Sequence, residues 1–129
     1  MKGQSSVEFM VYIGILLVIL SVFLWSSNSL QSRLNEVKIQ NDAQQLCDKV
    51  AFEINTAVRS GNGYKRDFYM EKSFFGVSDF NITVDYYTVY LTWNNFSVIS
   101  NIITKNITGT INEGRINSIE NRGGIIYVN

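Results

Sequence analysis

The stretch of sequence that decides the fold is FMVYIGILLVILSVFLW, residues 9–25, in which Ser21 is the only clearly polar side chain. No charged residue occurs between Glu8 and Arg33, a run of 24 residues. A helix of this length spans about 36 Å, which exceeds the roughly 30 Å thickness of a bilayer's hydrocarbon core. Because the run is apolar on every side, it requires cover by lipid or by protein. We therefore expect residues 9–25 to form a transmembrane segment or the core of an assembly.

The charges on either side of this apolar run predict its orientation. Lys2 and the initiator amine precede the run, and the next positive side chain is Arg33. Because positive charge near the ends of a span is retained on the cytoplasmic side, the N-terminus is expected inside.

Beyond Trp25 the chain keeps a helical period but becomes amphipathic. Leu30, Leu34 and Val37 fall on one helix face. A second face, turned well away from the first, carries Ile39, Ala43, Leu46, Cys47, Val50, Ile54 and Ala57. The chain contains no proline to interrupt the helix, and Gly61 is placed to end it in a left-handed conformation. We expect one helix over residues 4–60, apolar in its first half and amphipathic in its second.

The last part of the chain, residues 64–129, has the alternating pattern of β-strands. Phe80, Ile82 and Val84 alternate with polar residues, and further strands are expected over 87–93, 96–100, 107–111 and 125–128. A unit of this size is marginal as an independent core. We therefore predict an α+β fold, in which a small antiparallel β head over 64–129 packs on the second face of the helix.

The composition argues against most kinds of chemistry. The chain has no histidine, a single cysteine and a net charge of zero. No imidazole can serve as a general base or metal ligand, and the single Cys47 excludes an intrachain disulfide and a thiolate zinc cluster. No catalytic motif and no basic patch for nucleic acid is present. We expect no enzyme activity, no metal, no cofactor and no nucleic-acid partner.

The first nine residues, MKGQSSVEF, hold the most specific motif of the chain. A charge, a glycine and a small polar segment with one acid stand directly before the apolar run. An ordinary secretory signal is cut after its apolar region, whereas here the helical pattern continues through the serines that follow Trp25. The alternative is a cut between Gly3 and Gln4, which leaves the apolar helix on the mature protein.

This N-terminus resembles the class III signal peptide of archaeal type IV-like pilins. The motif of that family is matched here by Gln4, Ser6, Glu8 and Phe9, next to the apolar run. The resemblance implies a membrane precursor with its N-terminus inside, removal of residues 1–3 by a prepilin peptidase, and extraction into an extracellular filament at the cell surface. It implies a type IV pilin-like fold, other pilin subunits as partners and adhesion to surfaces as a role.

Glu8 would then be an isolated acid at the edge of an apolar core, where an unpaired carboxylate is costly. The new amine of Gln4 on an adjacent subunit is the expected partner. Two alternatives stay open. Glu8 interacts with the positive end of its own helix dipole, or its only role is recognition by the peptidase.

Three asparagines of the remaining chain are candidates for glycosylation, and the single cysteine is a candidate for a buried thiol or a disulfide. Asn81, Asn95 and Asn106 each open an N-x-S/T sequon within the expected head, although three sequons are no more than chance predicts. Cys47 is expected to be a buried free thiol, with an intersubunit disulfide as the alternative.

These observations favour a structural filament subunit. The alternatives are a single-span membrane protein that displays a small binding head without polymerising, and a minor or initiating pilin that primes an assembly.

Overall fold

A computed structural model describes residues 2–129, with the side chains of residues 2, 3 and 29 excepted. The chain divides into two compact units, Met1–Val37 and Lys38–Asn129, here called the N-terminal and C-terminal units. The predicted α+β fold is confirmed: a single long helix, α1 (Lys2–Ser60), is followed by seven β-strands. Met1 lies outside the described residues, so the predicted leader 1–3 is described only in part.

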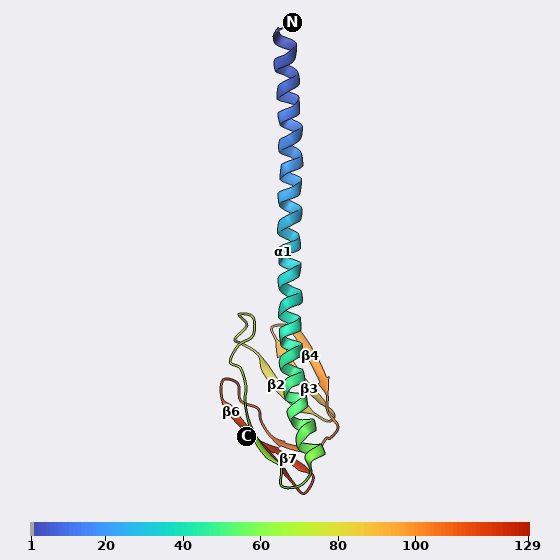
Figure 1. Cartoon of the computed structure of the whole chain (residues 1–129), viewed down its shortest axis with the longest axis vertical. Helices are drawn as coiled ribbons and strands as arrows, with labels where there is room; N and C mark the ends of the chain where they lie inside the picture. The colour runs from blue at the N-terminus through green and yellow to red at the C-terminus, as the bar shows by residue number, and fades with distance from the viewer. Residues whose placement is uncertain (1) are drawn as a thin grey trace. The chain divides into compact units, whose positions relative to one another are not determined.

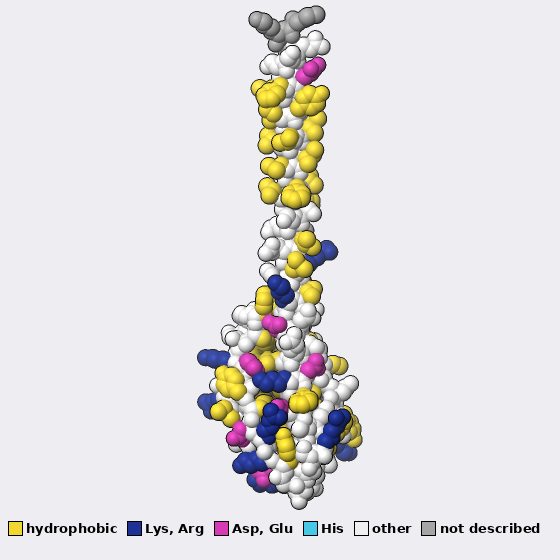
Figure 2. Space-filling view, in the orientation of Figure 1, with side chains coloured by type: hydrophobic (Ala, Val, Ile, Leu, Met, Phe, Trp, Pro, Cys, Tyr) yellow, Lys and Arg dark blue, Asp and Glu magenta, His cyan; other side chains and the backbone are white. Residues whose placement is uncertain are grey.

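The N-terminal unit consists of helix alone. Every side chain described between residues 4 and 37 is exposed. Hydrophobic side chains cover the visible face of the apolar run (Figure 2). Gly14, the one glycine within the run, would meet nothing within 4 Å if it carried a Cβ. The α-helix is therefore maintained here by its own hydrogen bonds, and its apolar surface has no cover within the unit.

In the C-terminal unit, the last part of α1 lies across two β-sheets (Figure 1). All seven residues of the predicted second helix face are buried or half-buried, beginning with Ile39. Together with the inward side chains of the strands they form one hydrophobic core. The largest fully buried side chains in this core include Ile54, Leu91, Ile119 and Ile126. This packing confirms the prediction that the helix and the strands share a core.

One sheet has three strands in the order β2-β3-β4, and the other has four in the order β1-β6-β7-β5. The strands are β1 (Lys65–Tyr69), β2 (Asn81–Asp85), β3 (Thr88–Trp93), β4 (Phe96–Asn101), β5 (Ile107–Gly109), β6 (Ile116–Arg122) and β7 (Ile125–Val128). All pairs are antiparallel except β5 and β7, which run parallel. The predicted antiparallel head is thus mixed at this one pair, because the chain crosses from the three-stranded sheet before it forms β5.

The edge of β4 is covered by amide side chains of α1. Gln44 Nε2 donates to the carbonyl oxygen of Ile99 at 2.9 Å, and Asn55 Nδ2 donates to the carbonyl oxygen of Asn101 at 3.4 Å. Exposed strand edges invite pairing with other chains. These two contacts occupy part of the free edge and fix the helix over the sheet.

The helix ends where the sequence predicts. Gly61 has φ +83°, a left-handed conformation that residues with a Cβ adopt only at a cost. Its N–H donates to the carbonyl oxygen of Val58 at 3.3 Å. The carbonyl oxygen of Ala57 accepts from Asn121 Nδ2 at 2.9 Å, so a side chain of β6 also satisfies the end of the helix.

Candidate functional site

The apolar run is the most unusual surface of the protein. Its aromatic side chains are largely exposed, with Tyr12 at 69% and Trp25 at 78%. Soluble monomers rarely expose contiguous apolar patches larger than a few hundred Å², and larger ones mark interaction or membrane sites. By length and composition, the described part of the chain contains one helix able to span a membrane. This surface requires lipid or protein as its cover.

Glu8 is the one acid next to this surface. It is exposed, and its neighbours Val7 and Phe9 are exposed at 64% and 65%. The attraction of the helix dipole for anions is strongest in the first helical turn. Because α1 begins at Lys2, Glu8 lies beyond that turn. This position argues against the alternative that Glu8 stabilises the N-terminal end of its own helix. A carboxylate placed here is instead available to a positive group from outside the unit.

The expected cleavage site lies at the start of the same helix. Gln4 is exposed, and the backbone of Gly3 is helical. The side chain of Lys2 lies outside the described residues, as does Met1. Cleavage between Gly3 and Gln4 therefore stays a prediction from the sequence.

The three sequons lie in the C-terminal unit, and all three asparagines are exposed. Asn81 is the first residue of β2, and Asn95 lies in the turn between β3 and β4. Asn106 precedes β5, and its carbonyl oxygen accepts from the backbone N–H of Ile126 at 2.9 Å. The structure thus brings Asn81 and Asn95 to one end of the three-stranded sheet and places Asn106 beside the other sheet.

Cys47 is a free and fully buried thiol, so the prediction of a buried cysteine is confirmed. Its Sγ donates to the carbonyl oxygen of Val89 at 3.4 Å. Burial raises the pKa of the thiol to about 11, the charge of Asp48 adds to this effect, and a backbone hydrogen bond with Leu91 partly offsets it. The thiol is therefore protonated at neutral pH and inaccessible to a disulfide partner while the unit is folded.

We expect iodoacetamide at pH 8 to spare Cys47 in the folded protein and to alkylate it once urea unfolds the C-terminal unit. A thiol with a pKa near 11 holds about a hundredfold less thiolate than one near 9. Between pH 9 and 11 the unfolded chain loses the thiol proton first, so the free energy of unfolding should fall as pH rises. Mass spectrometry reports the alkylation, and Cys47→Ala should lose this part of the pH dependence. Rapid alkylation of the folded protein would contradict the buried position.

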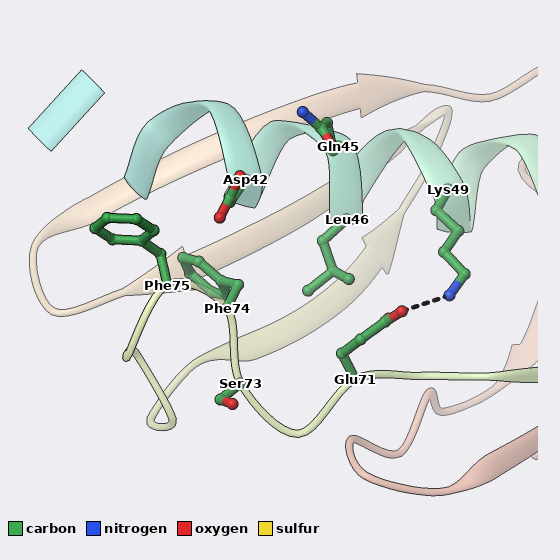
Figure 3. A pocket seen from close by; sticks show the side chains of 8 residues that line it. All are labelled: Asp42, Gln45, Leu46, Lys49, Glu71, Ser73, Phe74 and Phe75. Atoms are coloured by element: carbon green, nitrogen blue, oxygen red, sulfur yellow. Dashed lines mark hydrogen bonds and ion pairs between the residues drawn. The ribbon is translucent and has the colours of Figure 1, made fainter. Parts of the chain in front are cut away.

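An open groove of about 440 Å³ lies between α1 and the segment that follows β1. Figure 3 shows Leu46 and Phe74 pointing into it, with Lys49 joined to Glu71 at its edge. Lys49 Nζ donates to Glu71 Oε1 at 2.8 Å and to the carbonyl oxygen of Tyr69 at 2.9 Å. These contacts tie the segment to the helix. Within the described part of the chain, no three His, Cys, Asp or Glu side chains gather as a metal site would require.

An ion pair between a buried acid and an exposed arginine was missed by the sequence analysis. Glu53 on α1 is 5% exposed, and its Oε2 lies 3.5 Å from Arg66 Nη1 on β1. Lys65, Arg66 and Asp67 are exposed and begin β1, which pairs with β6. The helical position of Glu53, between Val50 and Ile54 of the buried face, was the available signal.

Comparison with known proteins adds no family to this description: no protein-family model, curated protein or solved structure matches the chain.

Proposed function

We propose that the chain is a structural subunit of an archaeal type IV-like pilus, which polymerises through its N-terminal helix. The observation that carries this proposal is the exposed apolar run with a single acid, Glu8, at its beginning. Lipid covers this surface in a membrane precursor, and other copies of the same helix cover it in a filament. The fold, one long apolar helix followed by a small β unit, is compatible with a pilin.

The proposed sequence of events begins in the membrane, with the N-terminus inside. A prepilin peptidase cuts between Gly3 and Gln4, which removes Lys2 and creates a positive amine at Gln4. This amine pairs with Glu8 of an adjacent subunit, so the pairing neutralises the acid and sets the axial register between subunits. The C-terminal unit faces outward on the cell surface, where adhesion is the proposed role. No catalysis, metal or cofactor is involved.

A membrane anchor that does not polymerise would expose the same apolar run to lipid. Such an anchor has no need for an acid at the edge of the membrane-spanning segment, since a carboxylate near the membrane costs free energy. Glu8 therefore favours the filament subunit over the anchor. A minor or initiating pilin would share both features and differs only in its abundance within the filament.

We expect the mature protein to begin at Gln4. N-terminal sequencing of the native protein tests this, together with electron microscopy for filaments. Gly3→Val should retain the leader, because a bulky side chain would occupy the small-residue position at the cut, whereas Ser27→Val should be processed normally. An intact Met1, or a mature start near Ser27, would show that the protein is not a pilin of this class.

A further inference from the structure

The two β-sheets differ in the chemistry of their outer faces, which are turned away from α1. On the three-stranded sheet, the outward side chains form cross-strand rows of three. The rows are Asn81, Thr92 and Ser97; Thr83, Tyr90 and Ile99; and Asp85, Thr88 and Asn101. Only one of these nine side chains is charged.

The outer face of the four-stranded sheet exposes apolar side chains too, namely Tyr69, Ile116, Ile125 and Tyr127, but this face is also charged. It carries four charged side chains, of which Glu120 and Arg122 form an ion pair at 2.8 Å. Lys65 lies opposite Glu120 in the register, and Asp67 lies one outward position farther along β1. Charged side chains keep a surface soluble. The lack of charge on the three-stranded sheet is therefore a local property of that face and does not extend to the whole unit.

The first two of the three rows carry no charged side chain, and we call these two rows the uncharged face. This face also exposes apolar surface. Tyr90 and Ile99 are cross-strand partners, exposed at 37% and 53%. Hydroxyl and amide groups surround this apolar surface. A ligand that suits it is uncharged, rich in hydrogen-bonding groups and equipped with apolar patches, which describes an oligosaccharide.

Two of the three sequons lie at the edge of this same face. Asn81 begins its first row, and Ser97, the hydroxyl residue of the Asn95 sequon, ends that row two strands away, about 10 Å across the sheet. Asn95 itself lies in the adjoining turn. The register thus places both modifiable amides at one end of the uncharged face, within reach of Tyr90 and Ile99. Asn106, in contrast, leads into the outer row of the charged sheet through Thr108.

We propose that Asn81 and Asn95 carry N-linked oligosaccharides, and that these cover the outer face of the three-stranded sheet. In the modification, the side-chain amide nitrogen of asparagine bonds to the anomeric carbon of a lipid phosphate-linked oligosaccharide. The bond between that carbon and the phosphate oxygen breaks, the lipid phosphate leaves with the electron pair, and the amide loses one proton. The attached sugars then form hydrogen bonds with the hydroxyl and amide rows and pack on Tyr90 and Ile99.

This proposal rests on the proposed function in one respect, because the C-terminal unit must face the compartment that holds the glycan donor. We expect the coverage to prevent self-association of this sheet, since a bulky hydrophilic chain at the start of the edge strand β2 blocks edge pairing.

The test uses the full chain produced in its native host. Glycopeptide mass spectrometry should find sugar on Asn81 and on Asn95. Thr83→Ala should remove the glycan from Asn81, and Thr83→Ser should keep it; Ser97→Ala and Ser97→Thr form the matched pair for Asn95. Unmodified Asn81 and Asn95 peptides, or sugar on Asn106 alone, would overturn the proposal.

Coverage is measured by nitration of tyrosines in the detergent-solubilised protein. Tyr90 and Tyr127 have nearly equal exposure, 37% and 36%, but lie on different sheets. We expect Tyr127 to react and Tyr90 to be protected in the glycosylated protein. In the Thr83→Ala, Ser97→Ala double variant both should react equally. Equal reaction before and after removal of the glycans would show that the sugars do not lie on this face.

The same samples separate the two proposals. Unmodified peptides in a protein that begins at Gln4 and forms filaments would overturn glycan coverage alone. An unmodified protein that keeps Met1, with a C-terminal unit protected from external protease, would overturn both. Association of the double variant into larger particles through Tyr90 would support the shielding role of the sugars.

Discussion

Replacement of Glu8 by alanine is expected to abolish filament assembly while leaving membrane insertion intact. Insertion depends on the apolar run, which the substitution does not touch. Assembly would leave the amine of Gln4 on each adjacent subunit buried without its counterion. Removing one partner of a buried ion pair costs about 3–5 kcal/mol, which corresponds to roughly a hundredfold to several thousandfold in affinity. Because the contact recurs at every subunit, the loss should stop polymerisation.

Glu36→Ala is the matched control for this experiment. Glu36 is an exposed acid on the same helix, but it lies outside the apolar run. We expect it to assemble normally, whereas Glu8→Gln should fail like Glu8→Ala because the amide has no charge. Membrane fractionation measures insertion, and electron microscopy measures filaments. Abundant normal filaments from Glu8→Ala would rule out the charge pairing.

The second large effect is expected from Asn121→Ala, which should destabilise the C-terminal unit. Asn121 is 2% exposed. Its Nδ2 donates to the carbonyl oxygen of Ala57 at 2.9 Å, and its Oδ1 accepts from the N–H of Gly124 at 2.9 Å. Alanine leaves the buried carbonyl oxygen of Ala57 unpaired, at about 1–3 kcal/mol, whereas the N–H of Gly124 lies in an exposed turn where water can replace the lost acceptor. A loss near 2 kcal/mol would lower the Tm of a unit of this size by roughly 8–16 °C.

Asn62→Ala provides the comparison from the same turn. Asn62 Oδ1 accepts from the N–H of Gly123 at 2.7 Å, but this residue is exposed, so water replaces the lost acceptor. We expect its effect to be well below that of Asn121→Ala. Thermal unfolding of the full chain in detergent, followed by near-ultraviolet circular dichroism, measures both. Equal shifts from the two variants would contradict the role of burial at Asn121.

Several parts of the fold follow from local pattern alone. Seven residues of the buried face of α1 were predicted, because helical periodicity needs only one segment of sequence; Ala51 and Glu53, which are also buried, were not among them. The strands β2, β3 and β4 were also predicted, since their inward positions are apolar and their outward positions are mostly polar. The strand expected over 87–93 begins one residue later, at Thr88, because Tyr87 lies in the turn between β2 and β3, where it is 51% exposed.

The strands β1 and β6 were missed for a physical reason. The inward positions of β6 are Asn117, Ile119 and Asn121, so two of its three buried side chains are polar. An asparagine is acceptable inside only when its amide is satisfied, as Asn117 is by the N–H and carbonyl of Asn112 at 2.7 and 2.9 Å. Those partners come from other segments, so no periodicity in β6 reveals them.

The sequence by itself determined the long helix, the exposed apolar run and the isolated acid at its beginning. These depend on neighbours a few residues away, on charge and on hydropathy, all of which are readable along one segment. Only the tertiary structure decided that Asn121 binds the end of α1, that Glu53 meets Arg66, and that two sequons share one uncharged face. Each of these is a meeting of residues distant in the chain, set by strand order and register, which local preferences do not specify.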